Sequence, residues 1–144
     1  EARGAFLGMG LDTTRAQMTQ AVLEGVAFAI RDSVEIARSL GLTIAKSGLC
    51  GGGAKSELWR RIMANVLNLD LEVPESEQGA GYGGAILAMV AAGAYDSVRT
   101  ACRALQTPRT VYHPDPAIAA RYEARYQVFR TLYPALREIY PTFA

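Results

Sequence analysis

The sequence is short of the residues that build metal centres and disulfide frameworks. It has two cysteines, Cys50 and Cys102, and one histidine, His113, in 144 residues. A structural zinc site needs about four Cys or His ligands, so these three residues exclude one. The cysteines are far apart and lack a CxxC spacing. Without a secretory context we expect them to be small core residues rather than a disulfide.

The sequence also lacks a charge bias and long hydrophobic runs. Its 15 basic and 14 acidic residues are interspersed and give a net charge of +1. We therefore expect no binding to nucleic acid or to a membrane surface. No apolar run reaches the ~18–20 residues of a membrane helix, and no signal segment opens the chain. Half of the residues are hydrophobic, which is typical of one soluble globular domain, and we expect a cytoplasmic location.

The first forty residues predict one strand and one long helix. The chain opens without a methionine, and the apolar run Gly4–Met9 follows almost at once. This run predicts a buried strand, and we expect the chain to begin inside a domain. Apolar residues then recur at helical spacing over about Thr14–Leu40. Asp12-Thr13-Thr14 supplies the N-cap of this helix, and Gly41 ends it.

The next fifty residues alternate strands with helices. Ile44–Cys50 predicts a strand, and Ser56-Glu57 opens a second helix. Leu69–Val73 alternates with period two and stops at Pro74, which predicts a third strand. A glycine-rich helix follows over about residues 80–92. This order, with short connections, predicts a layered α/β domain with a mostly parallel sheet.

The last third predicts helices only. Asp96 or Ser97 caps a short helix, and a longer one runs over about residues 116–139. Pro116 suits the first helical position, whereas Pro134 is expected to kink or divide the helix. An aromatic stripe with helical spacing is expected to serve in packing: Tyr122, Tyr126, Phe129 and Tyr133.

The sequence Gly51-Gly52-Gly53-Ala54 stands between a predicted strand and a predicted helix. Glycines let a ligand approach the backbone, and the N–H groups of a helix start favour negative charge. The turn is therefore a candidate for nucleotide or phosphate binding, and a tight turn without a ligand is an equal alternative. Lys55-Ser56 resembles the end of a P-loop. Ala54 and Leu49 stand where that motif needs glycine, which excludes a P-loop.

The stretch Gly79–Gly84 matches G-x-G-x-x-G, the pattern of a dinucleotide-binding turn. That turn follows its strand directly, whereas here Pro74 and four polar residues intervene. We favour glycines that let a helix approach its neighbours, with a small dinucleotide-binding domain as the weaker alternative. Glu24, on an apolar helix, is either functional or a hydrogen-bonded structural residue. His113 is not expected to act as a general acid or base.

Taken together, these motifs resemble the C-terminal domain of the FGGY family of carbohydrate kinases. The segments that carry the resemblance are Gly4–Met9 with Gln17–Glu24, Gly51–Ser56 with Trp59, and Glu77–Ala85. The ending is most similar to that of xylulose kinases, through Tyr112-His113-Pro114, Tyr122, Tyr126 and Leu132-Tyr133-Pro134.

The resemblance implies a partial actin-like ATPase domain, ribonuclease-H-like, with three layers and C-terminal helices. It divides the chain into an α/β nucleotide-binding core, residues 1–93, and a C-terminal helical extension, residues 94–144. It also implies nucleotide-binding residues at the adenosine end of an ATP site: Gly51, Gly52, Gly53 and Ala54. Glu57 occupies a position that reaches the nucleotide in some members, where Asn is common.

On this resemblance, the parent enzyme transfers the γ-phosphate of ATP, bound with Mg²⁺, to a ketose, with D-xylulose giving D-xylulose 5-phosphate as the best match. The family's catalytic aspartate and sugar pocket lie in an upstream domain, so no catalytic residue and no metal ligand is assigned here. The chain alone is expected to be inactive. The alternative is a non-catalytic nucleotide-binding or regulatory module of the same fold. A free sheet edge would also allow a homodimer.

Overall fold

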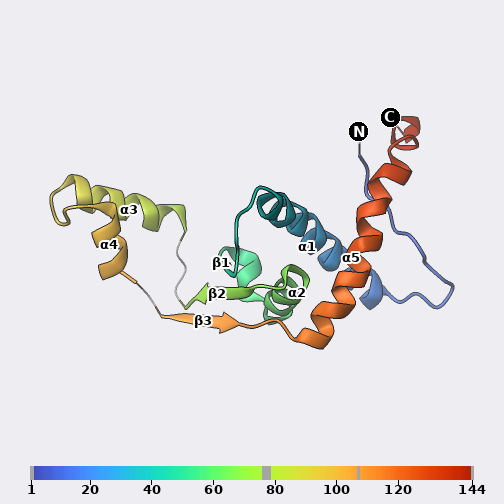
Figure 1. Ribbon diagram of the computed structural model, residues 1–144, viewed down its shortest axis with the longest axis horizontal. Helices are drawn as coiled ribbons and strands as arrows, with labels where there is room; N and C mark the ends of the chain where they lie inside the picture. Colours follow the sequence, from blue (N-terminus) through green and yellow to red (C-terminus); the bar gives the residue numbers. More distant parts are fainter. Residues whose placement is uncertain (1, 76–78, 107, 144) are drawn as a thin grey trace.

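The computed structural model describes residues 2–75, 79–106 and 108–143. Long helices cover a small sheet, and two short helices lie apart from them at one end of the molecule (Figure 1). The elements in chain order are α1 (Arg15–Ser39), β1 (Lys46–Gly48), the 3-10 turn η1 (Gly52–Lys55), α2 (Glu57–Leu67), β2 (Asp70–Pro74), α3 (Ala80–Ala91), α4 (Val98–Ala104), β3 (Arg109–Tyr112), α5 (Pro116–Leu136) and the 3-10 turn η2 (Tyr140–Phe143). No helix in the described part of the chain is both long and apolar enough to cross a membrane.

The helix boundaries follow from their caps. At α1, the Thr14 hydroxyl accepts from the Gln17 backbone N–H at 3.3 Å, and the Gln17 side chain accepts from the Thr14 N–H at 2.7 Å. This reciprocal capping box satisfies two free N–H groups. Gly41, with φ of +85°, follows the helix as predicted. The predicted caps of the other helices are also confirmed: Ser56 for α2, Ser97 for α4 and Asp115 for α5.

The sheet has the order β1-β2-β3, with β1 and β2 parallel and β3 antiparallel to β2. Strands β1 and β2 confirm the prediction, whereas β3 was not predicted and makes the sheet mixed. The predicted buried strand at Gly4–Met9 is wrong for this structure. These residues are not paired, and their large side chains are about half exposed. Within the described residues no strand lies beside them, and a strand needs a partner for its backbone N–H and C=O groups.

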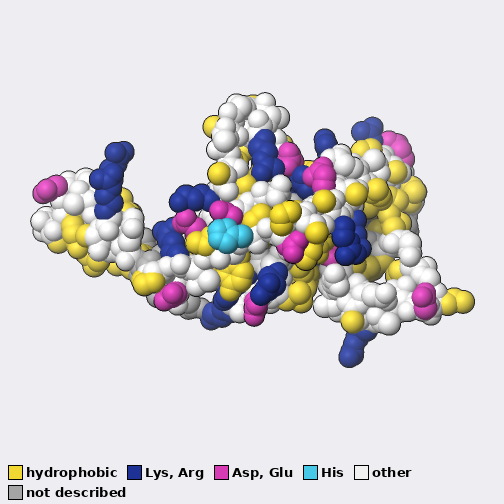
Figure 2. Space-filling view, turned by 60° about the horizontal axis from the view of Figure 1, so that its bottom comes forward, with side chains coloured by type: hydrophobic (Ala, Val, Ile, Leu, Met, Phe, Trp, Pro, Cys, Tyr) yellow, Lys and Arg dark blue, Asp and Glu magenta, His cyan; other side chains and the backbone are white. Residues whose placement is uncertain are grey.

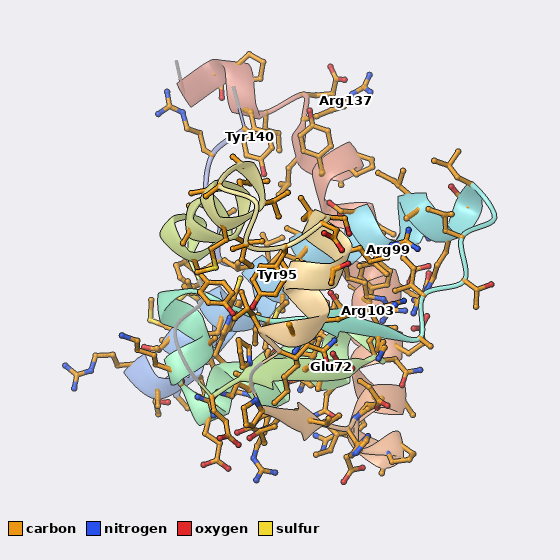
Figure 3. All side chains as sticks on the ribbon, turned by 90° about the vertical axis from the view of Figure 1, so that its left-hand side faces the viewer. Glu72, Tyr95, Arg99, Arg103, Arg137 and Tyr140 are labelled. Carbon is orange, nitrogen blue, oxygen red and sulfur yellow. The ribbon has the colours of Figure 1, made fainter. Side chains whose placement is uncertain are left out.

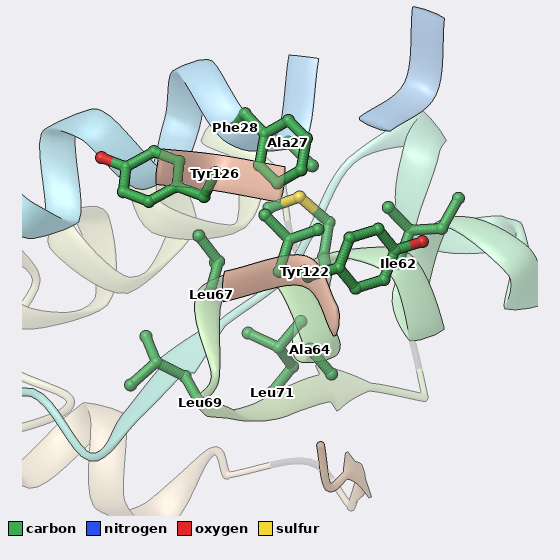
Figure 4. Packing of buried hydrophobic residues seen from close by; sticks show 11 residues of the cluster. Ala27, Phe28, Ile62, Ala64, Leu67, Leu69, Leu71, Tyr122 and Tyr126 are labelled. Carbon is green, nitrogen blue, oxygen red and sulfur yellow. The ribbon is translucent and has the colours of Figure 1, made fainter. Parts of the chain in front are cut away.

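The hydrophobic core lies where α2 meets β2, α1 and α5. Apolar side chains of α2 and β2 are buried there, and Phe28 of α1 sits among aromatic rings of α5 (Figure 4). Its ring centroid is 6.0 Å from that of Tyr122, 5.9 Å from that of Tyr126 and 5.2 Å from that of Phe129. The predicted aromatic packing is therefore confirmed at these three positions. Tyr133 is 60% exposed and packs outside the core, where its ring stacks on that of Tyr140 with centroids 6.2 Å apart.

The opposite face of the sheet is charged. Glu72 on β2 accepts from Lys46 of β1 and from Arg109 of β3, both at 2.7 Å. The hydrogen bond from Lys46, followed by that from Arg109, lowers the pKa of Glu72. His113 Nδ1 and Asp70 Oδ1 are 2.8 Å apart, and Figure 2 shows the histidine among charged side chains on this surface. The sheet therefore has one apolar face and one charged face, as is usual for a sheet covered on one side.

Helices α3 and α4 pack against each other at a distance from the core. Figure 3 looks at the molecule from this end and labels Arg99 and Arg103 on α4. A Cβ placed at any of the glycines in Gly79–Gly84 would meet nothing within 4 Å, so the predicted close helix approach there is not found. Residues 76–78 lie outside the described residues, and with them the beginning of the Glu77–Ala85 segment that carries part of the family resemblance.

Two smaller predictions also need correction. Cys50 and Cys102 are exposed free thiols, not core residues. Cys50 lies in the loop after β1, and Cys102 lies on the surface of α4. Neither position is in the core, although both side chains are small enough for one. Of the two effects predicted for Pro134, a kink or a division of the helix, the division is not found, because α5 continues through Pro134 to Leu136. Pro134 has no N–H to donate to the Arg130 carbonyl, so the helix passes the proline with that bond missing.

Candidate functional site

The glycine loop, residues Gly51–Ala54, lies at the carboxyl edge of the parallel strands. Because β1 and β2 run in the same direction, the segments that leave them start from the same edge. The segment after β1 is the glycine loop, and the segment after β2 leads towards Gly79, the N-cap of α3. Ligands of open α/β sheets bind outside this edge. The glycine loop is therefore in the position at which such a fold holds a ligand.

The backbone of the loop depends on glycine. Gly51 has φ of +85°, a conformation that is costly for residues with a side chain. Gly52–Lys55 then form a 3-10 turn, in which the Ala54 N–H donates to the Gly51 carbonyl at 3.0 Å. The three glycines are exposed, whereas Ala54 is buried. The loop thus presents bare backbone to the outside and is anchored on the inside through Ala54.

Gly53 packs against the indole ring of Trp59. A Cβ at Gly53 would lie 3.1 Å from Trp59 Nε1 and 3.2 Å from Cδ1, closer than most real Cβ contacts. Trp59 is held by α2, whose N-cap Ser56 accepts from the Trp59 N–H at 3.3 Å. Any side chain at Gly53 must therefore displace the ring or the loop. Trp59 is also the sole tryptophan of the chain, which makes it a reporter of the loop.

Arg60 ties the loop to β3. Its Nε donates to the Ala54 carbonyl, and its Nη1 donates to the Tyr112 hydroxyl at 2.7 Å. The guanidinium carbon is also 5.3 Å from the centroid of the Tyr112 ring. Sequence reasoning missed this pair because Arg60 and Tyr112 are 52 residues apart and β3 was not predicted. The arginine fixes the position of Ala54, and with it the end of the glycine loop.

Glu57 is the first residue of α2 and lies next to the loop in the chain. Its side chain is 65% exposed and accepts from Arg61 Nη2 at 2.8 Å and from Nε at 3.0 Å. A carboxylate in the first turn of a helix interacts favourably with the helix dipole. The structure thus places Glu57 on the same helix start as the glycine loop, with its carboxylate bound to its own helix.

Glu24 lies apart from this edge, between α1 and α5. It is buried and accepts from Gln20 at 2.7 Å, from the Tyr122 hydroxyl at 2.8 Å and from Arg125 at 3.2 Å. Burial, followed by the hydrogen bond to Glu24, raises the pKa of Tyr122 to about 12. These hydrogen bonds favour the second of the two interpretations, a hydrogen-bonded structural carboxylate.

The Gly79–Gly84 stretch lines a different pocket. This pocket, of about 290 Å³, lies between α3 and α4 and is also lined by Cys102, Leu105 and Arg109. Tyr82 closes one side by donating to the Leu105 carbonyl at 2.7 Å.

In the described part of the chain, no group of three or more His, Cys, Asp or Glu residues could hold a metal ion.

Comparison with known proteins shows to which family this chain belongs. Residues 1–92 match the C-terminal domain of the FGGY family of carbohydrate kinases. The chain belongs to this FGGY kinase family. Its fold is accordingly that of the actin-like ATPases, seen here as part of a C-terminal domain with a small mixed sheet.

The similar proteins are sugar and polyol kinases. The chain is 29% identical to a xylulose kinase of Staphylococcus epidermidis over 96% of its own length and 28% of that protein. It superposes on a xylulose kinase from Brucella ovis with a TM-score of 0.86 and 35% identity, over 96% of the chain and 28% of that structure. A Plasmodium falciparum glycerol kinase with ADP gives a TM-score of 0.74 and 25% identity, over 92% and 27%. The FGGY chain thus spans little more than a quarter of the relatives that it matches.

Proposed function

We propose that this FGGY chain is the C-terminal, nucleotide-binding part of an ATP-dependent kinase that phosphorylates a ketose. The observation that carries the proposal is the open glycine loop at the carboxyl edge of β1, in a chain of the FGGY family. Gly51, Gly52, Gly53 and Ala54 line the adenosine end of the nucleotide site. The activity belongs to the longer protein of which this chain supplies the ATP side.

The geometry of the loop suits a nucleotide. Its three exposed glycines let a flat base or a ribose approach the backbone, and the start of α2 favours negative charge nearby. Glu57 offers carboxylate oxygens at this helix start, to which ribose hydroxyls can donate. Mg²⁺ bound with the phosphates would neutralise their charge; among the described residues no group of three or more His, Cys, Asp or Glu could hold the ion.

The chain alone has no turnover in this proposal. Two of its aspartates are engaged in structural contacts: Asp32 accepts from Tyr126 at 2.6 Å, and Asp70 pairs with His113. Phosphoryl transfer requires a positioned acceptor hydroxyl and stabilised charge, and one side of a site provides neither. A coupled assay with Mg-ATP and D-xylulose should give no product with this chain. Turnover clearly above background would contradict this part of the proposal.

D-Xylulose is the proposed substrate, giving D-xylulose 5-phosphate. The supporting observation is that relatives from Staphylococcus epidermidis, Staphylococcus xylosus and Bacillus subtilis are named xylulose kinases. One relative of 31% identity is named for L-xylulose and 3-keto-L-gulonate, which also carry a keto group and support a ketose as the substrate class. The second candidate function is a non-catalytic nucleotide-binding module of the same fold, favoured only by the small share of the relatives that the chain covers.

A calorimetric titration with Mg-ADP tests the proposed nucleotide site. The folded chain should bind, and Gly53→Asp should abolish binding because its side chain collides with Trp59 and adds negative charge. Gly4→Asp is the matched control, since Gly4 is exposed and has open space around it. Gly83→Asp tests the dinucleotide alternative and should also bind normally. No binding by the folded chain, or equal binding by Gly53→Asp, would refute the proposed site.

A further inference from the structure

The connection between β3 and α5, residues 112–115, is fastened to α2 at both of its ends. At the first end, the Tyr112 hydroxyl accepts from Arg60 Nη1 at 2.7 Å. At the other end, the Asp115 backbone N–H donates to Asn65 Oδ1, also at 2.7 Å. Both partners belong to α2. Two hydrogen bonds thus join this short connection to one helix.

These contacts hold α2 in its place on the sheet. Asn65 is 8% exposed, and a buried acceptor that loses its donor destabilises the fold. Tyr112 lies opposite Leu71 of β2, so the sheet itself places its ring. Helix α2 also packs in the core against Tyr122 and Tyr126 of α5 (Figure 4). Strand β3 and helix α5 therefore act together on the position of α2.

The glycine loop is directly connected to α2. Only Ser56 stands between the 3-10 turn η1 and the first residue of the helix. The three glycines have no side chains that could anchor the loop, and the carbonyl of Ala54 accepts from Arg60 Nε. Because the same guanidinium donates to Tyr112, one chain of hydrogen bonds runs from the loop through Arg60 to β3.

We propose that β3 and α5 position the glycine loop for nucleotide binding, with Tyr112 as the positioning residue that acts through Arg60 on Ala54. This inference rests on the proposed function, since it concerns the affinity of the same site. Both elements lie beyond residues 1–92, the part that matches the family domain. A loop that is already held in its binding conformation loses less conformational freedom when the ligand arrives.

The alternative is that the contact between Arg60 and Tyr112 stabilises the fold without affecting the loop. Trp59 distinguishes the two, because it is the only tryptophan of the chain and its indole lies against Gly53. Its fluorescence therefore reports on the loop in folded molecules. A variant that is merely less stable keeps the wild-type signal for as long as it is folded.

Tyr112→Phe tests the proposal, because it removes the hydroxyl and keeps the ring. Calorimetry should show a dissociation constant for Mg-ADP that is about threefold higher, as expected for one lost hydrogen bond. Acrylamide should also quench the fluorescence of Trp59 more strongly. Tyr133→Phe is the matched control: it makes the same change at a 60% exposed position of α5 and should alter neither quantity. An unchanged dissociation constant and unchanged quenching in Tyr112→Phe would overturn the proposal.

A double variant tests whether Tyr112 acts through Arg60. Arg60→Met already removes the hydrogen bond to the tyrosine, so adding Tyr112→Phe should raise the dissociation constant by less than about twofold more. A further threefold rise would show that the two residues act independently and would overturn the proposed route. Circular dichroism on each variant checks that the measurements are made on folded protein.

Failure of this inference is distinguishable from failure of the proposed function. If Mg-ADP binds equally to the wild type and to Tyr112→Phe, with unchanged quenching of Trp59, the nucleotide site stands and this inference falls. If the wild type does not bind Mg-ADP but quenching still increases in Tyr112→Phe, the positioning of the loop is supported. The proposed nucleotide-binding function then falls instead.

Discussion

The contact between α1 and α5 and the glycine loop beside β1 differ in how their polar groups find partners. Between the helices, Glu24, Arg31 and Asp32 of α1 each bind a side chain of α5. Among the described residues, no buried side-chain nitrogen or oxygen lacks a hydrogen-bond partner. At the loop, exposed glycines present backbone to solvent, and the anchoring contacts lie on the inner side.

This difference indicates which of the two regions is the better candidate for binding a ligand. A buried carboxylate is a functional candidate in a sequence, but the hydrogen bonds that Glu24 accepts come from side chains of α1 and α5. The glycine loop has few side-chain atoms, and its chemistry is in the backbone and the helix start. Stability should therefore be sensitive to changes between α1 and α5, and nucleotide affinity to changes at the loop.

The largest expected effect is on stability, from Phe28→Ala. Phe28 is 6% exposed and contacts three aromatic rings of α5, so its removal leaves a cavity between the helices. We expect a loss of about 3–5 kcal/mol in the free energy of unfolding, measured by urea denaturation. Val22→Ala, on the exposed side of the same helix, should cost under about 1 kcal/mol. Equal losses for the two variants would contradict the arrangement.

Glu24→Gln should have the next largest effect. The variant keeps the size of the side chain but removes the charge that Tyr122 and Arg125 bind, so we expect a loss of about 1–3 kcal/mol. The pKa of Tyr122 should fall towards its ordinary value, which a spectroscopic tyrosine titration measures. Glu138→Gln is the control, because Glu138 pairs with Arg137 in an exposed position. If Mg-ADP binding fell instead of stability, Glu24 would be a functional residue.

Much of the fold could be predicted because its signals are local. The caps Thr14, Ser56, Ser97 and Asp115 each act within three residues of their helix, so the sequence alone contains the interaction. Strand β2 could be predicted for a similar reason, since it alternates along its own length. The glycine loop also depends on local conformation, and its place after β1 follows from the order of the elements.

The remaining features depend on contacts between distant residues. Strand β3 is short and exists through its pairing with β2, with Leu71 opposite Tyr112. Gly4–Met9 has the composition of a strand, but composition does not supply the neighbouring strand that it needs. The Arg60–Tyr112 contact likewise joins α2 to β3 and has no local pattern. Such features require the three-dimensional arrangement.

Arg60→Met should weaken nucleotide binding while changing stability less than the two preceding variants. The loss of its hydrogen bonds releases the Ala54 carbonyl and the Tyr112 hydroxyl, so the end of the glycine loop is no longer held. We expect Mg-ADP affinity to fall about tenfold, equivalent to about 1.4 kcal/mol. Tyr112→Phe should cause a smaller loss, because it removes one of these bonds. Arg121→Met, on the exposed side of α5, is the control, and equal affinity in all variants would show that Arg60 does not position the loop.

The last expected effect is a pH dependence that belongs to the α1–α5 contact alone and is absent at neutral pH. Burial raises the pKa of Tyr126 to about 12, as it does for Tyr122, and the hydrogen bond to Asp32 adds to this. In the unfolded chain a tyrosine has a pKa of about 10. The folded protein therefore holds these protons more tightly, so this contribution to stability is complete below about pH 10 and is lost as the pH rises towards 12.

Unfolding measured at several pH values should show this decline, and the variant Tyr122→Phe/Tyr126→Phe should have a flatter profile in the same range. The variant is less stable at every pH because it lacks both hydroxyls, so the slope rather than the absolute value is compared. The two proteins differ only at these two positions, so the difference between their slopes isolates the two hydroxyls. Equal slopes would mean that the two hydroxyls are as acidic in the folded chain as in water. The carboxylates Glu24 and Asp32 would then not be bound by these tyrosines, and the closed polar contact that contrasts with the open loop would be refuted.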